Sequence, residues 1–558
     1  MKCTITEKEI LDLPLSHKVG QVCSPIFQSS SVTPDISRFI TEYGIAFVRY
    51  CPNAFYDNHS KVVGSPNSYL TPASNASLLN SLQTLSMTKG SGFPLIFGVD
   101  QEGGTRNDIN RYGALVFGSH MSFGCANDLK LTEEAAYLTG CQMRSLGINL
   151  VQAPITDVFS FAGRHTLKAA SFGEDPKLVT EHALAMMRGY QRSGLAVMIK
   201  HFPGYGATAV DAHKGMAEVT KSFQELELHD NLPIRSLLQS GAEAVMTGHV
   251  IVEAMDSSRL PATLSAQIIR GYLRKTLGFQ GVVETDAMRM SAIQEKYGTA
   301  QASIMALQAG CDVLLLRGDS EHFLDGYRAV YDAVKTGVLD ESLLNESLLR
   351  IHRLRKKINI YDNALVPNEI AARSFRTKEV SACEQAVAAQ SVVVLKDREK
   401  QLPLVSSPNT KILVIQPKPQ KLDGANDSEQ SEDMLIQEVV EQFPGAQSLL
   451  TELVPTVDNI TSAKELCAES EVVIVGSINA INFDHQLELV QVCLASGKRV
   501  IVVAMESPYD LSLYSGASTC ICSLGASRAA MRNVVNIISG KLTPSGRLPI
   551  TLQFEPPC

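Results

Sequence analysis

The segment 200–206 reads Lys-His-Phe-Pro-Gly-Tyr-Gly and combines cationic and imidazole side chains with a loop rich in glycine. It directly follows an apolar run, 195–199, that is typical of a buried parallel strand. The loop continues to Asp211-Ala212-His213. Because residues two apart share a face of an extended segment, Asp211 can hydrogen-bond one ring nitrogen of His213 and leave the other for proton transfer. The pattern predicts a proton-transfer group at the carboxyl end of a strand, where parallel α/β folds bind ligands.

Asp286 is a second candidate for chemistry. It lies in the sequence Val-Val-Glu-Thr-Asp-Ala-Met at 282–288, where another apolar run ends. A carboxylate nucleophile and a proton donor are the minimal equipment of a retaining glycosidase. The usual donor is a carboxylic acid, but an imidazole beside a carboxylate also holds a proton near neutral pH. We therefore expect Asp286 to act as nucleophile and His213, paired with Asp211, to transfer the proton.

Other polar side chains suit the recognition of a neutral polyol. Asp100 lies in the glycine-rich sequence Gly-Val-Asp-Gln-Glu-Gly-Gly at 98–104 and can accept hydrogen bonds from sugar hydroxyls. Lys200 and His201 can donate to the same hydroxyls. The chain has no HExxH motif, no P-loop and no dinucleotide-binding fingerprint. We expect no metal ion, nucleotide or other cofactor.

The elements that must position these residues alternate between short apolar runs and amphipathic stretches up to about residue 360. Eight strand–helix repeats predict an α/β fold, a (β/α)₈ TIM-type barrel over residues 1–358. Asp100, Lys200, His201, His249 and Asp286 each end an apolar run, and in a barrel such positions meet at one mouth. The eight expected strands are Val19–Ser24, Ile45–Tyr50, Pro94–Asp100, Ile148–Pro154, Ala196–His201, Ala244–His249, Gly281–Asp286 and Asp312–Leu316.

A second domain follows. Residues 359–378, with Pro367 and mixed polarity, are expected to form a linker, and residues 379–558 a smaller parallel sheet between helices, an αβα sandwich. Because the proton donor lies in a loop of the barrel, this domain is expected to add stability or substrate access and no catalytic group. Its expected strands are Ser391–Leu395, Lys411–Ile415, Val472–Val475, Arg499–Val503 and Thr519–Leu524.

The composition excludes several classes of protein. The chain has 558 residues, 45% of them hydrophobic, and a net charge of −8. It lacks a basic block, so nucleic acid is not an expected partner, and it lacks a membrane-length apolar run. The 12 cysteines are scattered through apolar segments, and the N-terminal residues contain no secretory apolar region. These features predict a cytoplasmic protein with no membrane association.

At this point the motifs resemble those of a known family, glycoside hydrolase family 3, and in particular its β-N-acetylglucosaminidase branch. The similar blocks occur in the family's order and extend over nearly the whole chain. In the first domain they are 98–104, 149–158, 171–176, 200–206, 211–213, 244–250 and 281–288, and in the second domain 388–396, 507–511 and 543–549.

The resemblance implies a TIM-type barrel followed by an αβα sandwich, and a retaining mechanism through a covalent glycosyl-enzyme. By position, Asp286 matches the nucleophile and His213 the acid/base, with Asp211 as its partner. Asp100, Lys200 and His201 match ligands of the sugar hydroxyls. His249 and Met288, which lie in the similar blocks, are also expected to bind substrate. The implied activity is exo-acting removal of terminal N-acetylglucosamine (GlcNAc) from an oligosaccharide or small glycoside.

The chain departs from the family pattern in three places. Lys168-Ala169-Ala170 stands where members commonly have a sugar-binding arginine, so Lys168 or Arg164 could supply the contact, or the contact could be lost. Tyr205 and Ala207 replace a histidine and an aspartate, and the sequence at 104–107 differs from the usual Gly-Arg-Val. These differences concern substrate recognition, chiefly on the leaving-group side.

Two alternative functions fit the same residues. One is a phosphorylase, because a histidine acid/base does not repel an incoming phosphate anion as a carboxylate would. The other is a sugar-binding protein without activity, since a fold does not guarantee a function. Release of sugar 1-phosphate, of free sugar or of neither separates the three readings.

Overall fold

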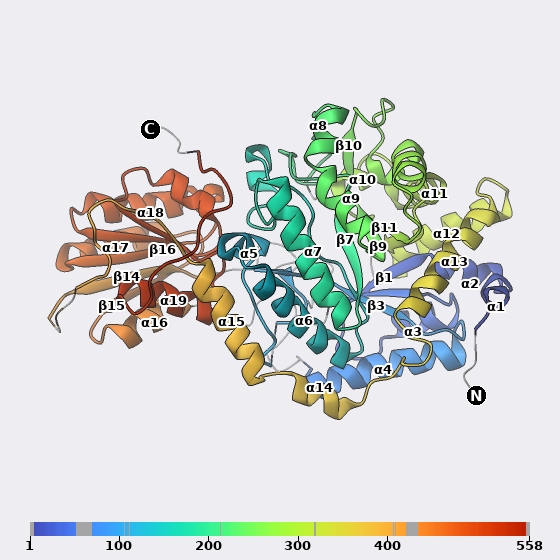
Figure 1. Ribbon diagram of the computed structural model, residues 1–558, viewed down its shortest axis with the longest axis horizontal. Coiled ribbons are helices and arrows are strands. Elements are labelled where there is room, and N and C mark those ends of the chain that lie inside the picture. Colours follow the sequence, from blue (N-terminus) through green and yellow to red (C-terminus); the bar gives the residue numbers. More distant parts are fainter. Residues whose placement is uncertain are drawn as a thin grey trace.

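The computed structural model describes residues 5–51, 70–104, 106–110, 112–212, 214–316, 320–405, 407, 409–419 and 433–553. These residues form two α/β domains that lie side by side, with helix α15 (Lys378–Ser391) running between them (Figure 1). The fold expected from the sequence, a barrel followed by a sandwich, is confirmed.

The first domain is built on eight parallel strands in the order β11-β9-β7-β6-β3-β2-β1-β12. The bridge between Glu284 and Val313 brings β11 against β12 and nearly closes the barrel. The strands are β1 (Cys23–Phe27), β2 (Phe47–Tyr50), β3 (Ile96–Val99), β6 (Leu150–Val151), β7 (Ala196–Phe202), β9 (Ala244–Thr247), β11 (Val282–Thr285) and β12 (Leu314–Leu316).

Helices surround this sheet, and their sequences explain where they begin. In α7 (Pro176–Arg192), Asp175 caps the first turn by accepting from the Lys177 amide, and the proline occupies a position that needs no amide donor. The other principal helices of this domain are α2 (Leu15–Gln21), α3 (Pro34–Thr41), α4 (Pro72–Lys89), α5 (His120–Ala126), α6 (Leu129–Leu146), α9 (Asn231–Gln239), α10 (Ser291–Gln294), α11 (Gly298–Ala309), α12 (Ser320–Lys335) and α13 (Glu341–Lys357).

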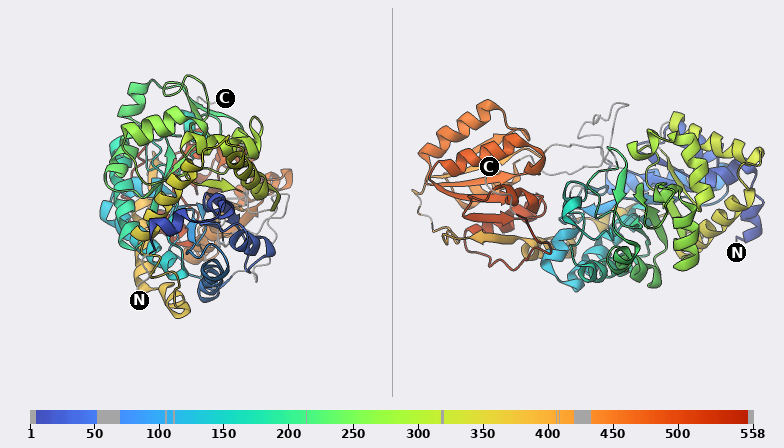
Figure 2. Two further views of the ribbon diagram at one scale, coloured as in Figure 1. Left: turned by 90° about the vertical axis from the view of Figure 1, so that its right-hand side faces the viewer. Right: turned by 90° about the horizontal axis from the view of Figure 1, so that it is seen from above.

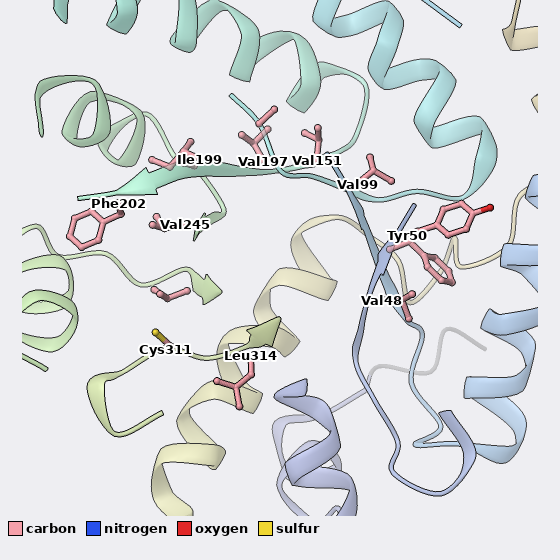
Figure 3. Close-up of a cluster of buried hydrophobic side chains, with 14 of the residues drawn as sticks. Val48, Tyr50, Val99, Val151, Val197, Ile199, Phe202, Val245, Cys311 and Leu314 are labelled. Atoms are coloured by element: carbon pink, nitrogen blue, oxygen red, sulfur yellow. The ribbon is translucent and has the colours of Figure 1, made fainter. Parts of the chain in front are cut away.

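Alternation along the strands divides the barrel core into two layers. Val197 and Ile199 on β7 belong to the cluster that packs between the strands and the helices, whereas Ala196 and Met198 belong to the cluster inside the barrel. Figure 3 shows part of the outer cluster, with Val197 and Ile199 next to Val245 of the neighbouring strand β9. The mouth of the barrel is therefore carried on a scaffold that is packed on both faces.

Two short pairs of strands follow barrel strands and shape the loops above the mouth. After β3 the chain forms the antiparallel pair β4 (Gln101–Gly103) and β5 (Arg106–Asn107). The parallel pair β8 (Ala217–Val219) and β10 (Val250–Val252) joins the loop after β7 to the loop after β9.

The second domain is a six-stranded sheet in the order β13-β18-β17-β16-β14-β15 with helices on both faces. Helices α16 (Met434–Gln442) and α19 (Arg528–Ile538) pack with one apolar cluster of the sheet, and α17 (Val457–Glu469) and α18 (Asp484–Ala495) with the other. The strands are β13 (Val393–Asp397), β14 (Ile412–Pro417), β15 (Gln447–Thr451), β16 (Val472–Ser477), β17 (Arg499–Ala504) and β18 (Thr519–Cys522).

Contacts between the domains are built partly from backbone hydrogen bonds. The Ser119 amide donates to the Leu524 carbonyl at 3.2 Å, and the Arg547 amide donates to the Cys125 carbonyl at 3.1 Å. Helix α15 also packs against α5 and α6 of the barrel domain and against α19 of the sandwich. Seen from above, the sandwich lies at one end of the molecule beside the barrel (Figure 2).

The structure differs from the sequence predictions in four elements. Residues 19–21 belong to α2, so the first strand begins at Cys23 and not at Val19. Strand β13 runs antiparallel to β18, so the second sheet is mixed, and β15 was not predicted because its sequence, Gln-Ser-Leu-Leu-Thr, is half polar at an exposed edge. The expected linker 359–378 contains a helix of its own, α14 (Asn368–Ser374).

Candidate active site

A cavity of about 270 Å³ lies where the carboxyl ends of the barrel strands meet the second domain. Asp100, Lys200, His201, His249 and Asp286, the five residues that end apolar runs, all line it. The geometry agrees with the general location of ligand sites in barrels of this type. The second domain completes the wall with residues that follow β16, β17 and β18.

A buried ionic network forms one side of the cavity. Lys200 Nζ lies 2.6 Å from Asp100 Oδ1 and 2.5 Å from Glu102 Oε1, and Arg49 Nη2 lies 2.5 Å from Asp100 Oδ2. Burial opposes ionisation of Asp100, but the charges of Arg49 and Lys200 outweigh it and hold its pKa well below the usual range. Asp100 is therefore an anion, and each of its two carboxylate oxygens is held by a cationic side chain.

His201 forms a dyad with a buried aspartate. Its Nδ1 lies 2.8 Å from Asp157 Oδ2, and the other carboxylate oxygen accepts from the Tyr205 amide at 2.6 Å. Burial lowers the pKa of His201, but the Asp157 carboxylate and the charge of Asp286 outweigh it, so the net shift is upward. The protonated ring is a donor at both nitrogens, which leaves Nε2–H for a ligand.

Asp286 is the first residue after β11, and its backbone is hydrogen-bonded to the neighbouring strand β9. Its amide donates to the Thr247 carbonyl at 3.1 Å, and its Oδ1 accepts from the Ala287 amide at 2.7 Å. The carboxylate is close enough to raise the pKa of both His201 and Tyr205. Asp286 is thus a carboxylate held at the cavity wall beside a ring that favours its charged form.

Tyr205 holds the loop that carries the Asp-x-His sequence. Its hydroxyl accepts from the Ala212 amide at 2.6 Å, and the Ala212 carbonyl accepts from the Ala292 amide at 3.2 Å. Burial raises the pKa of Tyr205, and the charges of Asp211 and Asp286 raise it further. Asp211 lines the cavity and, like Asp286, lies close enough to Tyr205 for its charge to act on the phenol. His213 lies outside the described residues.

His249 lines the cavity and also contacts the segment that carries Asp286. Its side chain is fully buried, Nδ1 lies 2.9 Å from Thr263 Oγ1, and Nε2 lies 3.1 Å from the Ala287 carbonyl oxygen. A carbonyl only accepts, so Nε2 carries a proton and donates it to the backbone next to Asp286. His249 therefore holds the nucleophile candidate's segment, and its expected contact with a sugar stays a prediction.

The remaining expected ligands divide between the cavity and its surroundings. Lys168 lines the cavity, but Arg164 does not, because its guanidinium stacks on the Phe161 ring at 4.0 Å. Met288 is fully buried and is not a lining residue, whereas Met290, two residues along, lines the cavity. Arg164 and Met288 are thus not among the residues that line the cavity, and their roles as substrate ligands stay predictions.

Several polar side chains of the site were not predicted. Arg49 interrupts the apolar run at 45–50, and that lone charge in a buried strand was the available signal. Glu102 and Asp157 lie in sequence blocks that were recognised without a role being given to these residues. Glu506 of the second domain lines the cavity, although that domain was expected to add stability or access only.

Two further properties concern cofactors and membranes. Among the described residues, no three His, Cys, Asp or Glu side chains come together as a group that could hold a metal ion. No helix in the described part of the chain has both the length and the apolar character needed to cross a bilayer.

Comparison with known proteins identifies relatives of both domains. The profile of "Glycosyl hydrolase family 3 N terminal domain" matches residues 18–354, and that of "Glycosyl hydrolase family 3 C-terminal domain" matches residues 392–556. The chain is similar to "Beta-hexosaminidase A" of Pseudoalteromonas piscicida, with 31% identity over 351 residues, which are 59% of this chain and 56% of that protein.

A second sequence relative and a solved structure are similar to this chain. A "Beta-N-acetylglucosaminidase/beta-glucosidase" of Cellulomonas fimi is 26% identical over 354 residues, 62% of this chain and 61% of that protein. The chain thus spans about three fifths of the length of these two relatives. A solved structure, a glycoside hydrolase family 3 beta-N-acetylglucosaminidase from Paenibacillus, superposes with a TM-score of 0.88 at 26% identity and covers 97% of this chain and 100% of that chain.

Proposed function

The chain belongs to glycosyl hydrolase family 3, and from this premise we propose that it is an exo-acting, retaining β-N-acetylglucosaminidase. The names of its relatives, beta-hexosaminidase and beta-N-acetylglucosaminidase, support this substrate class. The terminal GlcNAc of an oligosaccharide or small glycoside occupies the barrel mouth, and the leaving group extends away from the barrel.

Asp286 acts as the nucleophile in this proposal. Its carboxylate attacks the anomeric carbon and forms a glycosyl ester, while the bond from that carbon to the leaving oxygen breaks. The position of Asp286 directly after β11, with one oxygen held by the Ala287 amide, supports this role.

His213 supplies the proton to the leaving oxygen and afterwards takes a proton from the water that attacks the glycosyl ester. Asp211 stabilises its charged form. The location of Asp211 in the cavity wall, near the same Tyr205 as Asp286, supports the placement of a proton-transfer group on this loop.

Asp100, Lys200 and His201 bind the hydroxyls of the terminal sugar. Asp100 accepts hydrogen bonds, and Lys200 and His201 donate them, as charged partners that discriminate strongly against an apolar ligand. The buried ionic network supports this role because it fixes these groups before the ligand arrives, so little ordering remains to be done on binding.

The observation that carries the proposal is a single cavity that holds Asp286, Asp211 and the sugar-binding network together. The test compares hydrolysis of aryl β-N-acetylglucosaminide and aryl β-glucoside, with and without inorganic phosphate. We expect free GlcNAc from the first substrate, and Asp286→Ala should abolish its release. Asp256→Asn is the matched control, because Asp256 is a buried carboxylate that does not line the cavity. A preference for the glucoside, or sugar 1-phosphate as the product, contradicts the proposal.

A further inference from the structure

The second domain forms one wall of the cavity with the loops that follow its central strands. Asn479 comes two residues after β16, and Glu506 and Ser507 come two and three residues after β17, and all three line the cavity. The carboxyl ends of two parallel strands therefore face the barrel mouth across the cavity, at the edge of the sheet where α/β domains bind ligands. A substrate whose terminal sugar lies at Asp286 therefore extends toward these residues of the second domain.

Glu506 is held in one orientation by its neighbour. Asn479 Nδ2 donates to Glu506 Oε2 at 2.7 Å, which commits one carboxyl oxygen to the protein. Burial raises the pKa of Glu506, while the charge of Lys168, another lining residue, lowers it in part. The second oxygen, Oε1, has no hydrogen-bond donor among the described residues, so it can accept a hydrogen bond from a ligand in the cavity.

Two hydroxyls at the junction of the domains also lack partners. Ser507 is 2% exposed and lines the cavity, and its Oγ has no hydrogen-bond partner in the described part of the chain. The same holds for Oγ of Ser119, on the barrel side of the junction. A buried hydroxyl without a partner costs stability, and a ligand that supplies the missing hydrogen bond removes this cost.

Three residues on this side of the cavity have a left-handed backbone conformation. Lys168, Asn479 and Leu524 have φ angles of +50°, +51° and +57°, in the left-handed region that side chains other than glycine rarely adopt. All three line the cavity at the junction. Strained residues of this kind persist where the surrounding structure fixes them, and they cluster at ligand sites.

From these observations we propose that Glu506 and Ser507, with Asn479 as the residue that orients Glu506, form a subsite for the leaving group, and that this group is a neutral sugar residue whose hydroxyls donate to Glu506 Oε1. The inference rests on the proposed function, because it takes the terminal GlcNAc to lie at Asp286. An anionic leaving group is disfavoured here, since it would place a second negative charge beside a carboxyl that is already desolvated.

Glu506→Gln tests the subsite with little change in shape. Glutamine can keep the hydrogen bond to Asn479 with either end of its amide, so the cavity receives an NH₂ donor or a neutral carbonyl oxygen, and in both cases the charged acceptor is lost. Two substrates are compared: the disaccharide GlcNAc-β-1,4-GlcNAc, and methyl β-N-acetylglucosaminide, whose alkoxide leaving group also needs protonation but carries no hydroxyls.

We expect the ratio of kcat/KM for the disaccharide to kcat/KM for the methyl glycoside to fall about 10- to 100-fold in Glu506→Gln, the range for losing a hydrogen bond to a charged group. Glu438→Gln is the matched control: Glu438 is a buried carboxyl of the same domain, accepts from Arg528 Nε at 3.0 Å and does not line the cavity. It should leave the ratio at the wild-type value.

Other outcomes overturn the inference in distinguishable ways. An equal loss on both substrates assigns Glu506 to proton transfer or to folding, and an unchanged ratio shows that the leaving sugar does not contact it. If the wild-type protein releases GlcNAc from neither substrate, the proposed function itself fails. If wild-type activity is present and the ratio does not move, only the subsite is refuted.

Discussion

Glu284 should make the stability of the barrel depend on pH. It lies on β11, two residues before Asp286, is 1% exposed, and accepts from Gln152 Nε2 at 2.8 Å. Burial raises its pKa from 4.5 to about 7. Between these values the folded protein keeps the proton that the unfolded chain has lost, so the free energy of unfolding falls as pH rises through this window.

The magnitude follows from the same values. Each pKa unit between the folded and unfolded states is worth about 1.4 kcal/mol, so a carboxyl shifted from 4.5 to about 7 loses about 3 kcal/mol of stability between pH 4 and pH 8. Glu284→Gln keeps a neutral side chain that still accepts from Gln152. The variant should therefore lack this part of the pH dependence and be more stable than the wild type at pH 8.

The assay is urea unfolding at a series of pH values, followed by circular dichroism because the chain has no tryptophan. Replacing the exposed Glu441 by glutamine provides a control for the loss of one carboxyl. The reasoning is refuted if Glu284→Gln and the wild type show the same change in unfolding free energy between pH 4 and pH 8.

Two further predictions concern the loop that carries the proton donor. His213→Ala should slow the hydrolysis of glycosides with poor leaving groups by about 10²–10⁴, the usual contribution of a positioned acid, and slow that of glycosides with very good leaving groups less. Asp211→Asn should cause a smaller loss of rate. Equal slowing of good and poor leaving groups in the glycosylation step of His213→Ala would exclude His213 as the proton donor. Tyr205→Phe leaves the Ala212 amide without its partner, at a cost of about 1–3 kcal/mol, so kcat for poor leaving groups should fall. Tyr327→Phe is the control, because its hydroxyl donates to the Ser16 carbonyl and the residue does not line the cavity. Similar kinetics in both variants would show that Tyr205 does not position the loop.

Much of the barrel and of its polar mouth could be predicted, because parallel strands impose a simple rule. Each of the eight expected runs contains or overlaps a barrel strand, and Asp100, Lys200 and Asp286 reach one cavity because the carboxyl ends of parallel strands share an edge. The first strand was misplaced because residues 19–24, Val-Gly-Gln-Val-Cys-Ser, form a short run that suits either a buried helix or a buried strand, and periodicity does not separate the two over so few residues.

The orientation of individual side chains could not be predicted. Two histidines at strand ends show this: one ring nitrogen of His201 is bonded to Asp157, whereas both nitrogens of His249 are bonded, to Thr263 and to the Ala287 carbonyl, and the sequence does not distinguish the two cases. Glu506 was missed for a different reason. It reaches the cavity only through the packing of the second domain on the first, a contact between residues hundreds of positions apart that no local pattern encodes.

The most direct test of the central claim is the identity of the carboxylate that forms the glycosyl-enzyme. A mechanism-based fluoro-sugar of the GlcNAc type is incubated with the wild-type protein, which is then digested and analysed by mass spectrometry. We expect one labelled peptide, with the label on Asp286 and none in Asp286→Ala. A label on Glu506 or on any other carboxylate, with Asp286 unmodified, would contradict it.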